Sequence, residues 1–205
     1  NSGFLKIDLP EFAKFTKNKQ WNTNDEFKSL ISYNARQNFN KSITNNAKDY
    51  KVIIKQSLEP EEKELVKKYY DDVKERNLAI NIFDYPEKLF NNINSSPLWE
   101  CVMLYVVDEN GIEQLAAGVH CFKGNGIFCG FVVGLNYALN KQYRVYQNVL
   151  FNVIKRGKEL GVDETLLGFS AAFEKKRFGC DIYEGTAYLQ DNDNYQLEAI
   201  EMSGY

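Results

Sequence analysis

The sequence predicts an α/β protein of the α+β kind, in which helices flank a mixed, mostly antiparallel sheet. Two observations support this prediction. Apolar runs at 99–108, 112–122 and 127–135 are joined by Asn-Gly turns, which are typical of β-hairpins. A long helical pattern then follows, with apolar residues three and four positions apart between 146 and 160.

The first half of the chain contributes the other expected helices. A helical pattern covers 25–39, and a short strand follows at 50–54. The segment 57–77 predicts a helix, since Pro60 suits the first turn and acidic residues crowd the positive end of the helix dipole. A shorter helix is expected at 86–92.

After the long helix, which Gly161 is expected to end, the pattern alternates again. We expect a buried strand at 165–169, a short helix at 171–179, and a final hairpin that pairs 181–190 with 195–203.

Small residues are expected to share one face in the middle of the sheet. Gly118 and His120 alternate with apolar residues in the second strand of the meander, and Gly130 and Gly134 do so in the third. Missing side chains indicate a close neighbour, which can be a tightly packed helix or a ligand.

The composition is that of an ordinary soluble domain, with 44% hydrophobic residues over a length of 205. The net charge of −3 argues against a dedicated nucleic-acid binder. We divide the chain into a basic helical segment at 1–49, which can belong to a larger protein, and a domain at 50–205. The first 60 residues are net basic through Lys6, Lys14, Lys17, Lys19, Lys28, Arg36, Lys41, Lys48, Lys51 and Lys55.

The four cysteines lie in apolar runs without CxxC spacing, which favours buried, reduced thiols and a cytoplasmic location. A disulfide between Cys121 and Cys129 is the alternative, because the two flank a hairpin turn. No membrane span is expected. With His120 as the only histidine and no partner at ligand spacing, no metal site is expected.

Two stretches resemble a known superfamily. GLNYALNKQYRVYQNVLFNVIKRGKELG (134–161) is similar to the strand–Tyr–helix block of GNAT N-acyltransferases, and more narrowly to their FemAB-like branch. LLGFSAAFEKKRFGC (166–180) resembles that branch in the pattern Gly168, Ser170, Lys175 and Gly179. The resemblance implies the GNAT fold and transfer of an acyl group from acetyl-CoA or another acyl-CoA, or of an aminoacyl group from aminoacyl-tRNA. The acceptor it implies is the amine of a small molecule or peptide.

The resemblance also implies a donor site at the third meander strand and the start of the long helix. Orphan amides at a helix start, with an arginine beside them, favour an anion. Asn136–Gln142, where typical members carry a glycine-rich pyrophosphate loop, contains no glycine. The expected donor-binding residues are Val132, Val133, Leu135, Tyr143, Arg144 and Lys175.

For catalysis, the attacking amine must lose a proton to a base. Glu100 and His120 are the candidates, although an exposed strand end and an ordinary sheet-edge histidine are the alternative interpretations. Phe173 and Phe178 stand where many members carry a tyrosine that protonates the leaving thiolate. Ser170 or Tyr183 can take that role.

Three functional hypotheses therefore stay open. The first is an acyl-CoA-dependent N-acyltransferase, and the second is a FemAB-like aminoacyl transferase that acts on cell-wall or peptide amines. The third is a binding module that has lost catalysis. An active enzyme should have an open gap between two strands, whereas a degenerate module should have that gap plugged by Phe131 or Phe169. A tRNA user should show the basic residues of 14–55 on one face.

Overall fold

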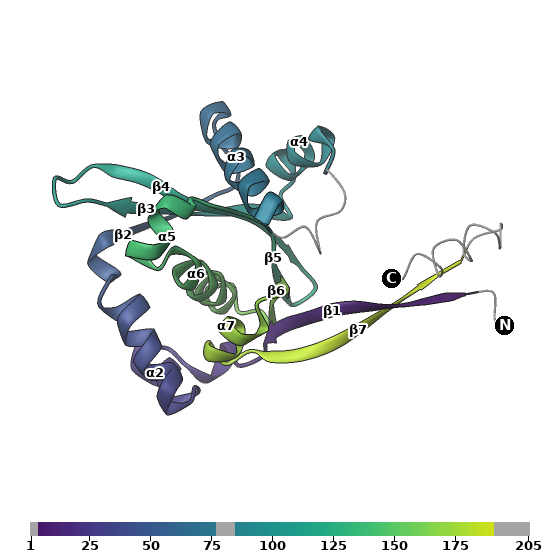
Figure 1. Ribbon diagram of the computed structural model, residues 1–205, viewed down its shortest axis with the longest axis horizontal. Coiled ribbons are helices and arrows are strands. Elements are labelled where there is room, and N and C mark those ends of the chain that lie inside the picture. The colour runs from purple at the N-terminus through teal and green to yellow at the C-terminus, as the bar shows by residue number, and fades with distance from the viewer. Residues whose placement is uncertain (1–3, 77–84, 191–205) are drawn as a thin grey trace.

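In the computed structural model, which describes residues 4–76 and 85–190, seven strands form one sheet in the order β2-β3-β4-β5-β6-β1-β7 (Figure 1). All neighbours are antiparallel except β5 and β6, which are parallel. The predicted fold class is therefore confirmed. The strands are β1 (Leu5–Phe15), β2 (Tyr50–Lys55), β3 (Trp99–Val107), β4 (Glu113–Gly124), β5 (Ile127–Leu135), β6 (Glu164–Phe169) and β7 (Asp181–Leu189).

Helices cover both faces of the sheet. The long helix α6 packs on one face against Val102, Ala117 and Val119, and α3 packs on the opposite face against Cys101 and Met103. Figure 1 shows α3 and α4 on one side and α6 and α7 on the other. The helices are α1 (Asn24–Ser29), α2 (Tyr33–Phe39), α3 (Pro60–Arg76), α4 (Glu87–Ser95), α5 (Tyr137–Tyr143), α6 (Val145–Glu159) and α7 (Ala172–Arg177).

Residues 4–49 are part of the same core as the rest of the chain. Their main element is a strand, β1, which the helical expectation for 1–49 did not include and which lies between β6 and β7. Trp21, Phe27 and Phe39 pack their rings against Phe151 of α6. The expected boundary at residue 49 therefore does not separate two hydrophobic cores.

Two β-bulges move side chains to faces that simple alternation does not predict. A register shift in the pairing of β3 with β4 places Leu115 on the α3 side and Ala117 on the α6 side. A second shift, in the pairing of β4 with β5, turns Gly130 toward α6 and Gly134 toward α3. The expectation that Gly130 and Gly134 share a face is therefore wrong, because a bulge inserts an unpaired residue.

The small-residue face is occupied by a helix. A Cβ built on Gly118 would lie 2.5 Å from Val66 Cγ2, and one on Gly134 would lie 2.6 Å from the Val66 carbonyl oxygen. Close packing of α3 thus explains these two glycines, and a ligand at their Cβ positions does not.

The cysteines are free thiols, so the alternative of a disulfide between Cys121 and Cys129 is wrong. The expected second strand of the final hairpin, 195–203, lies outside the described residues, and β7 pairs with β1 instead. None of the helices in the described ranges is both long enough and apolar enough to span a membrane.

Candidate functional site

The gap between β5 and β6 is the structural feature at which the candidate site is centred. The two strands pair from Ile127–Glu164 to Cys129–Leu166, and no pairing continues beyond that point. The bulge next to Gly130 bends β5, and Gly168 adopts a left-handed φ of +70° in β6. From Gly130 onward, the side of β5 that faces β6 therefore has no strand partner.

One side of this gap is lined by rings around Phe131. The Phe131 side chain is 47% exposed, and its ring centroid lies 5.5 Å from Trp99 and 5.8 Å from Tyr85. Trp99 alternates with Cys101 and Met103, so these rings stand on the α3 side of the sheet.

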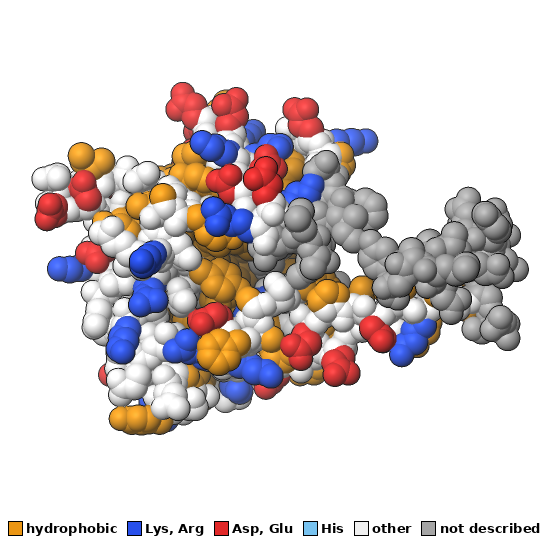
Figure 2. Space-filling view, in the orientation of Figure 1, with side chains coloured by type: hydrophobic (Ala, Val, Ile, Leu, Met, Phe, Trp, Pro, Cys, Tyr) orange, Lys and Arg blue, Asp and Glu red, His pale blue; other side chains and the backbone are white. Residues whose placement is uncertain are grey.

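The other side of the gap is lined by a second aromatic cluster. Phe169, at the end of β6, is 44% exposed and packs edge-on against Phe12 at 6.3 Å. Phe12 stacks on Tyr183 at 5.4 Å. Since Ala13 and Phe15 face the α6 core, Phe12 faces the α3 side, like Phe131. Figure 2 shows hydrophobic side chains gathered in a hollow between α3 and α7.

Lys175 holds the end of β6 in place. Its Nζ donates hydrogen bonds to the carbonyl oxygens of Gly168 (2.9 Å) and Phe169 (2.6 Å), and the residue is 2% exposed. Lys175 is one of the expected donor-binding residues, but its ammonium is bonded to the backbone inside the fold and does not face an anionic ligand. Burial lowers its pKa to about 8.

Ser170 and Tyr183 lie beside the same strand end. Ser170 has a φ of +58° and donates its backbone N–H to the Glu11 carbonyl, next to Phe12. Tyr183 is 40% exposed, and Lys14 Nζ lies over its ring, 5.1 Å from the ring centroid. The structure thus brings Ser170, Lys175 and Tyr183 together around Phe169.

Glu100 lies elsewhere and belongs to an ionic cluster. Its carboxylate accepts hydrogen bonds from Arg156 Nε (2.6 Å) and Nη2 (3.0 Å), and Lys123 Nζ is 3.1 Å away. Burial alone would raise the pKa of Glu100, but these two partners outweigh it and lower that pKa. Both interpretations from the sequence need correction: the residue is buried rather than exposed, and an ionised, fully bonded carboxylate is a poor general base.

His120 is 3% exposed and faces the α3 side between Cys101 and Val132. It makes no hydrogen bond with Glu100, Ser170 or Tyr183 in the described part of the chain. The four catalytic candidates therefore do not form one constellation.

Because burial lowers the pKa of His120 to about 4, the ring is expected to stay neutral in the folded protein across the range in which a free histidine titrates. Between pH 6.5 and 4 the unfolded chain binds a proton that the folded chain does not. Stability is therefore expected to fall as the pH drops through this window. The ¹⁵N shifts of this single histidine measure it directly, and a titration midpoint near 6.5 would contradict the prediction.

The α5–α6 junction replaces the expected turn at the helix start. Residues 137–143 are helical, and Arg144 breaks the helix with a φ of +57°. The Tyr143 carbonyl accepts hydrogen bonds from Asn46 Nδ2, Tyr50 Oη and Asn148 Nδ2 at 3.2, 3.0 and 3.3 Å.

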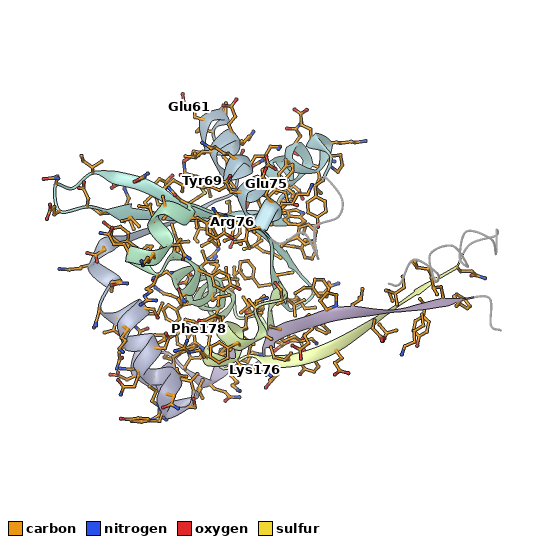
Figure 3. The ribbon with its side chains drawn as sticks, in the orientation of Figure 1. Glu61, Tyr69, Glu75, Arg76, Lys176 and Phe178 are labelled. Carbon is orange, nitrogen blue, oxygen red and sulfur yellow. The ribbon has the colours of Figure 1, made fainter. Side chains whose placement is uncertain are left out.

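One of the first N–H groups of α6, that of Tyr146, is already bonded to Asn140 Oδ1 at 2.9 Å. Arg76, at the end of α3 in Figure 3, lies 4.3 Å over the ring of Tyr137 and connects α3 to α5. The α5–α6 junction is therefore a bend between two helices that is fixed by side-chain contacts. A pyrophosphate-binding loop instead needs an open backbone with free N–H groups.

Most basic residues of 14–55 are neutralised locally. Lys14, Lys19 and Lys51 pair with Glu164, Asp163 and Glu113, and Lys28 and Lys55 pair with Asp25 and Glu62. Lys41 and Lys48 are exposed and have no ion pair among the described residues. These two, with the exposed Lys141 and Arg144, flank the α5–α6 junction.

The remaining donor-site candidates lie along β5 past the point where β6 departs. Val132 and Leu135 are buried and Val133 is half-buried, so a ligand can reach only backbone groups here. Those of Val133 and Leu135 point toward the gap, whereas those of Val132 point toward β4. An open pocket beyond the junction is lined by Lys48, Asp49, Asp108 and Gln142, and it lies away from the gap. No cluster of three metal-ligating side chains occurs in the described ranges.

Sequence reasoning missed Phe12 because it missed the strand that carries it. The alternation Leu5, Ile7, Leu9 was the available signal for β1, although Pro10 interrupts it.

A mixed sheet whose two parallel strands part beside a long helix is the architecture of the GNAT-like acyltransferase fold. No protein-family model matches the sequence, and no curated protein matches it. Solved structures do. The C-terminal domain of a lysylphosphatidylglycerol synthetase from Agrobacterium fabrum superposes with a TM-score of 0.62 at 13% identity. L-PGS from Bacillus licheniformis superposes with a TM-score of 0.63 at 11% identity, and FemX superposes with a TM-score of 0.61 at 10% identity.

These superpositions cover 97–98% of this chain, so the shared fold includes β1 and residues 4–49. They cover 66% of the first two structures and 68% of FemX. The chain thus spans about two thirds of the length of these neighbours, and the likeness at this identity establishes the fold.

Proposed function

We propose that the protein transfers an acyl or aminoacyl group from an activated donor to an amine, with aminoacyl-tRNA as the leading donor. The observation that carries the proposal is the gap between β5 and β6. It leaves unpaired backbone groups along one strand of a fold shared with FemX and with a lysylphosphatidylglycerol synthetase domain.

In the proposed reaction, the amine nitrogen of a peptide or small molecule attacks the donor carbonyl carbon. A C–N bond forms, and the ester C–O bond to the tRNA ribose breaks, or the C–S bond of a thioester. The proton lost by the amine ends on the leaving oxygen or sulfur. Backbone N–H groups of β5 at Val133 and Leu135, which point away from β4, would stabilise the charge that develops on the carbonyl oxygen.

The residues at the end of β6 suit supporting roles. Lys175 fixes the carbonyls of Gly168 and Phe169, which makes it a positioning residue for the edge of the gap. The Tyr183 and Ser170 hydroxyls are the candidates for moving a proton to the leaving group. Glu100 and His120 are poor bases for the reasons of charge pairing and burial given above.

Two features favour a tRNA donor over acyl-CoA. The α5–α6 corner contains no glycine and has one of its amides bonded to Asn140, so it offers a weak cradle for a diphosphate. Lys41, Lys48, Lys141 and Arg144 leave exposed positive charge around it, which attracts a polyanion. Acetyl-CoA or a longer acyl-CoA stays the second candidate donor.

The alternative of a silent binding module has less support. That hypothesis requires the gap to be plugged by Phe131 or Phe169, and each of these side chains is nearly half exposed. Neither side chain is therefore packed as a buried plug between the two strands.

The proposal is tested by calorimetric titration with acetyl-CoA, octanoyl-CoA and an aminoacylated acceptor-stem RNA. We expect the RNA to bind and Arg144→Ala to weaken it several-fold with a shallower salt dependence, because one phosphate contact is lost. Lys155→Ala, an exposed cation further along α6, is the control and should bind like the parent protein. Acyl-CoA binding without RNA binding would reverse the choice of donor, and no binding of either class would overturn the function.

A further inference from the structure

We infer that the group accepted in the gap between β5 and β6 is apolar, either an aromatic or branched aminoacyl side chain or a fatty acyl chain, and not a charged one such as lysyl. The inference rests on the proposed function and adds the chemical class of the transferred group. The side chains that line the gap and the pairing of the charges around it lead to this inference.

The lining itself is aromatic on both sides. Phe131 stands on β5, and Phe169, Phe12 and Tyr183 stand on β6, β1 and β7, all on the sheet face that α3 shares. Phe131 and Phe169 are nearly half exposed where the strands part, so they leave apolar surface in contact with water, which is unfavourable. An apolar group placed between them removes that area from water, at roughly 25 cal/mol per Å².

The rings are also held in position before a ligand arrives. Phe131 lies between Trp99 and Tyr85, and Phe169 rests its edge on Phe12, which is stacked on Tyr183. These contacts tie each exposed ring to a second ring of its own cluster. A pre-formed lining of this kind binds with little ordering cost.

The charged side chains that contact the residues lining the gap are already bonded within the fold, so they offer a charged group no free counter-ion. Lys14 bonds Glu164 at 3.1 Å, and its ammonium also lies over Tyr183. Lys175 is bonded to two backbone carbonyls. A lysyl ammonium in the gap would lose water and would have to compete with Lys14 for the Glu164 carboxylate, which is unfavourable.

The test uses 3′-amino-3′-deoxyadenosine acylated as a stable amide with phenylalanine, leucine, alanine, lysine or octanoic acid. All probes share the adenosine end of a tRNA, so differences in affinity report only the attached group. We expect the phenylalanyl, leucyl or octanoyl probe to bind about 10-fold or more tightly than the lysyl probe, in line with pocket discrimination by size and polarity. Comparison of the octanoyl probe with the phenylalanyl and leucyl probes shows whether the site prefers a fatty acyl group or an aminoacyl group.

The place at which the apolar group binds is tested with matched alanine variants. Phe131→Ala and Phe169→Ala should each weaken the best apolar probe about 10-fold, while Phe173→Ala, a 71% exposed ring on α7, should leave it unchanged. Binding should also change the fluorescence of Trp99, and the Trp99→Phe variant should lose that change. Equal or tighter binding of the lysyl probe, or no effect of the two gap variants, would overturn the inference while the proposed function stands. Failure of every probe, alanyl included, would overturn the aminoacyl-tRNA donor and the inference together.

Discussion

Replacement of Glu100 by alanine is expected to lower the free energy of unfolding by about 3 kcal/mol, the lower end of the cost of breaking a buried ion pair. Glu100 is 3% exposed and anchors Arg156 of α6 and Lys123 of β4 to the start of β3. Without the carboxylate, the two cations repel each other across a partly dry site. We expect a cost at the lower end of that range because Arg156 and Lys123 each keep about a quarter of their side-chain surface in water.

Urea unfolding of Glu100→Ala, Arg156→Met and the double variant measures this coupling in a double-mutant cycle. Lys67→Ala, which removes the exposed pair with Asp71, is the control and should change stability by less than about 0.5 kcal/mol. If Glu100→Ala were as stable as that control, the ionic cluster would not be what holds α6 to the sheet.

The same carboxylate has a pH dependence with a definite sign. Because its pKa is lower in the folded than in the unfolded protein, its contribution is fully present above pH 4.5 and is lost as the pH falls through the folded pKa. Acid destabilisation below pH 4.5 should therefore be weaker in the Glu100→Ala variant. The His120 window begins two pH units higher, at pH 6.5, so the onset of the two effects tells the groups apart.

Replacement of Gly134 by alanine is expected to cost about 2–3 kcal/mol, at the upper end of overpacking effects. The new Cβ would lie 2.6 Å from the Val66 carbonyl oxygen and 3.1 Å from the Tyr70 nitrogen. Both are backbone atoms of α3, so the clash cannot be relieved by rotating a side chain. The whole helix must move away from β5.

Gly130→Ala is the matched control for that substitution. It lies on the same strand with the same change of size, and its Cβ would meet Val153 Cγ1 at an ordinary 3.4 Å. Thermal unfolding should separate the melting temperatures of the two variants by about 4–12 °C for a chain of this size. Equal melting temperatures would mean that α3 is not seated on Gly134 as described.

The meander and the helix after it could be predicted because their signals are local. Asn-Gly turns and a three–four apolar spacing depend only on neighbouring residues, and both gave correct elements. β1 could not be recognised in the same way, since its partners Phe169 and Tyr183 lie near the other end of the chain. The only local signal was the alternation Leu5, Ile7, Leu9, which Pro10 interrupts, and nothing nearby in the sequence reinforces it.

The site was predicted less well because burial and charge pairing are long-range properties. Glu100 looked like an exposed strand end, yet its partner Arg156 lies on a helix far along the chain. Lys175 was expected to bind the donor, but the short helix α7 turns it back onto the end of the strand that precedes it. The bulge beside Gly130, which opens the gap, has no sequence mark other than the glycine itself.

The place of β1 has a consequence for how the chain reaches its fold during synthesis. β7 joins the sheet only through β1, and β1 finds both of its neighbours only after residues 164–189 have been made. β1, with Leu5, Ile7 and Leu9 along one side, therefore leaves the ribosome long before β6 and β7 exist. Closing so long a loop is slow, and an unpaired apolar strand invites aggregation meanwhile. The protein should consequently depend on chaperones to shield β1 until β6 and β7 have been translated.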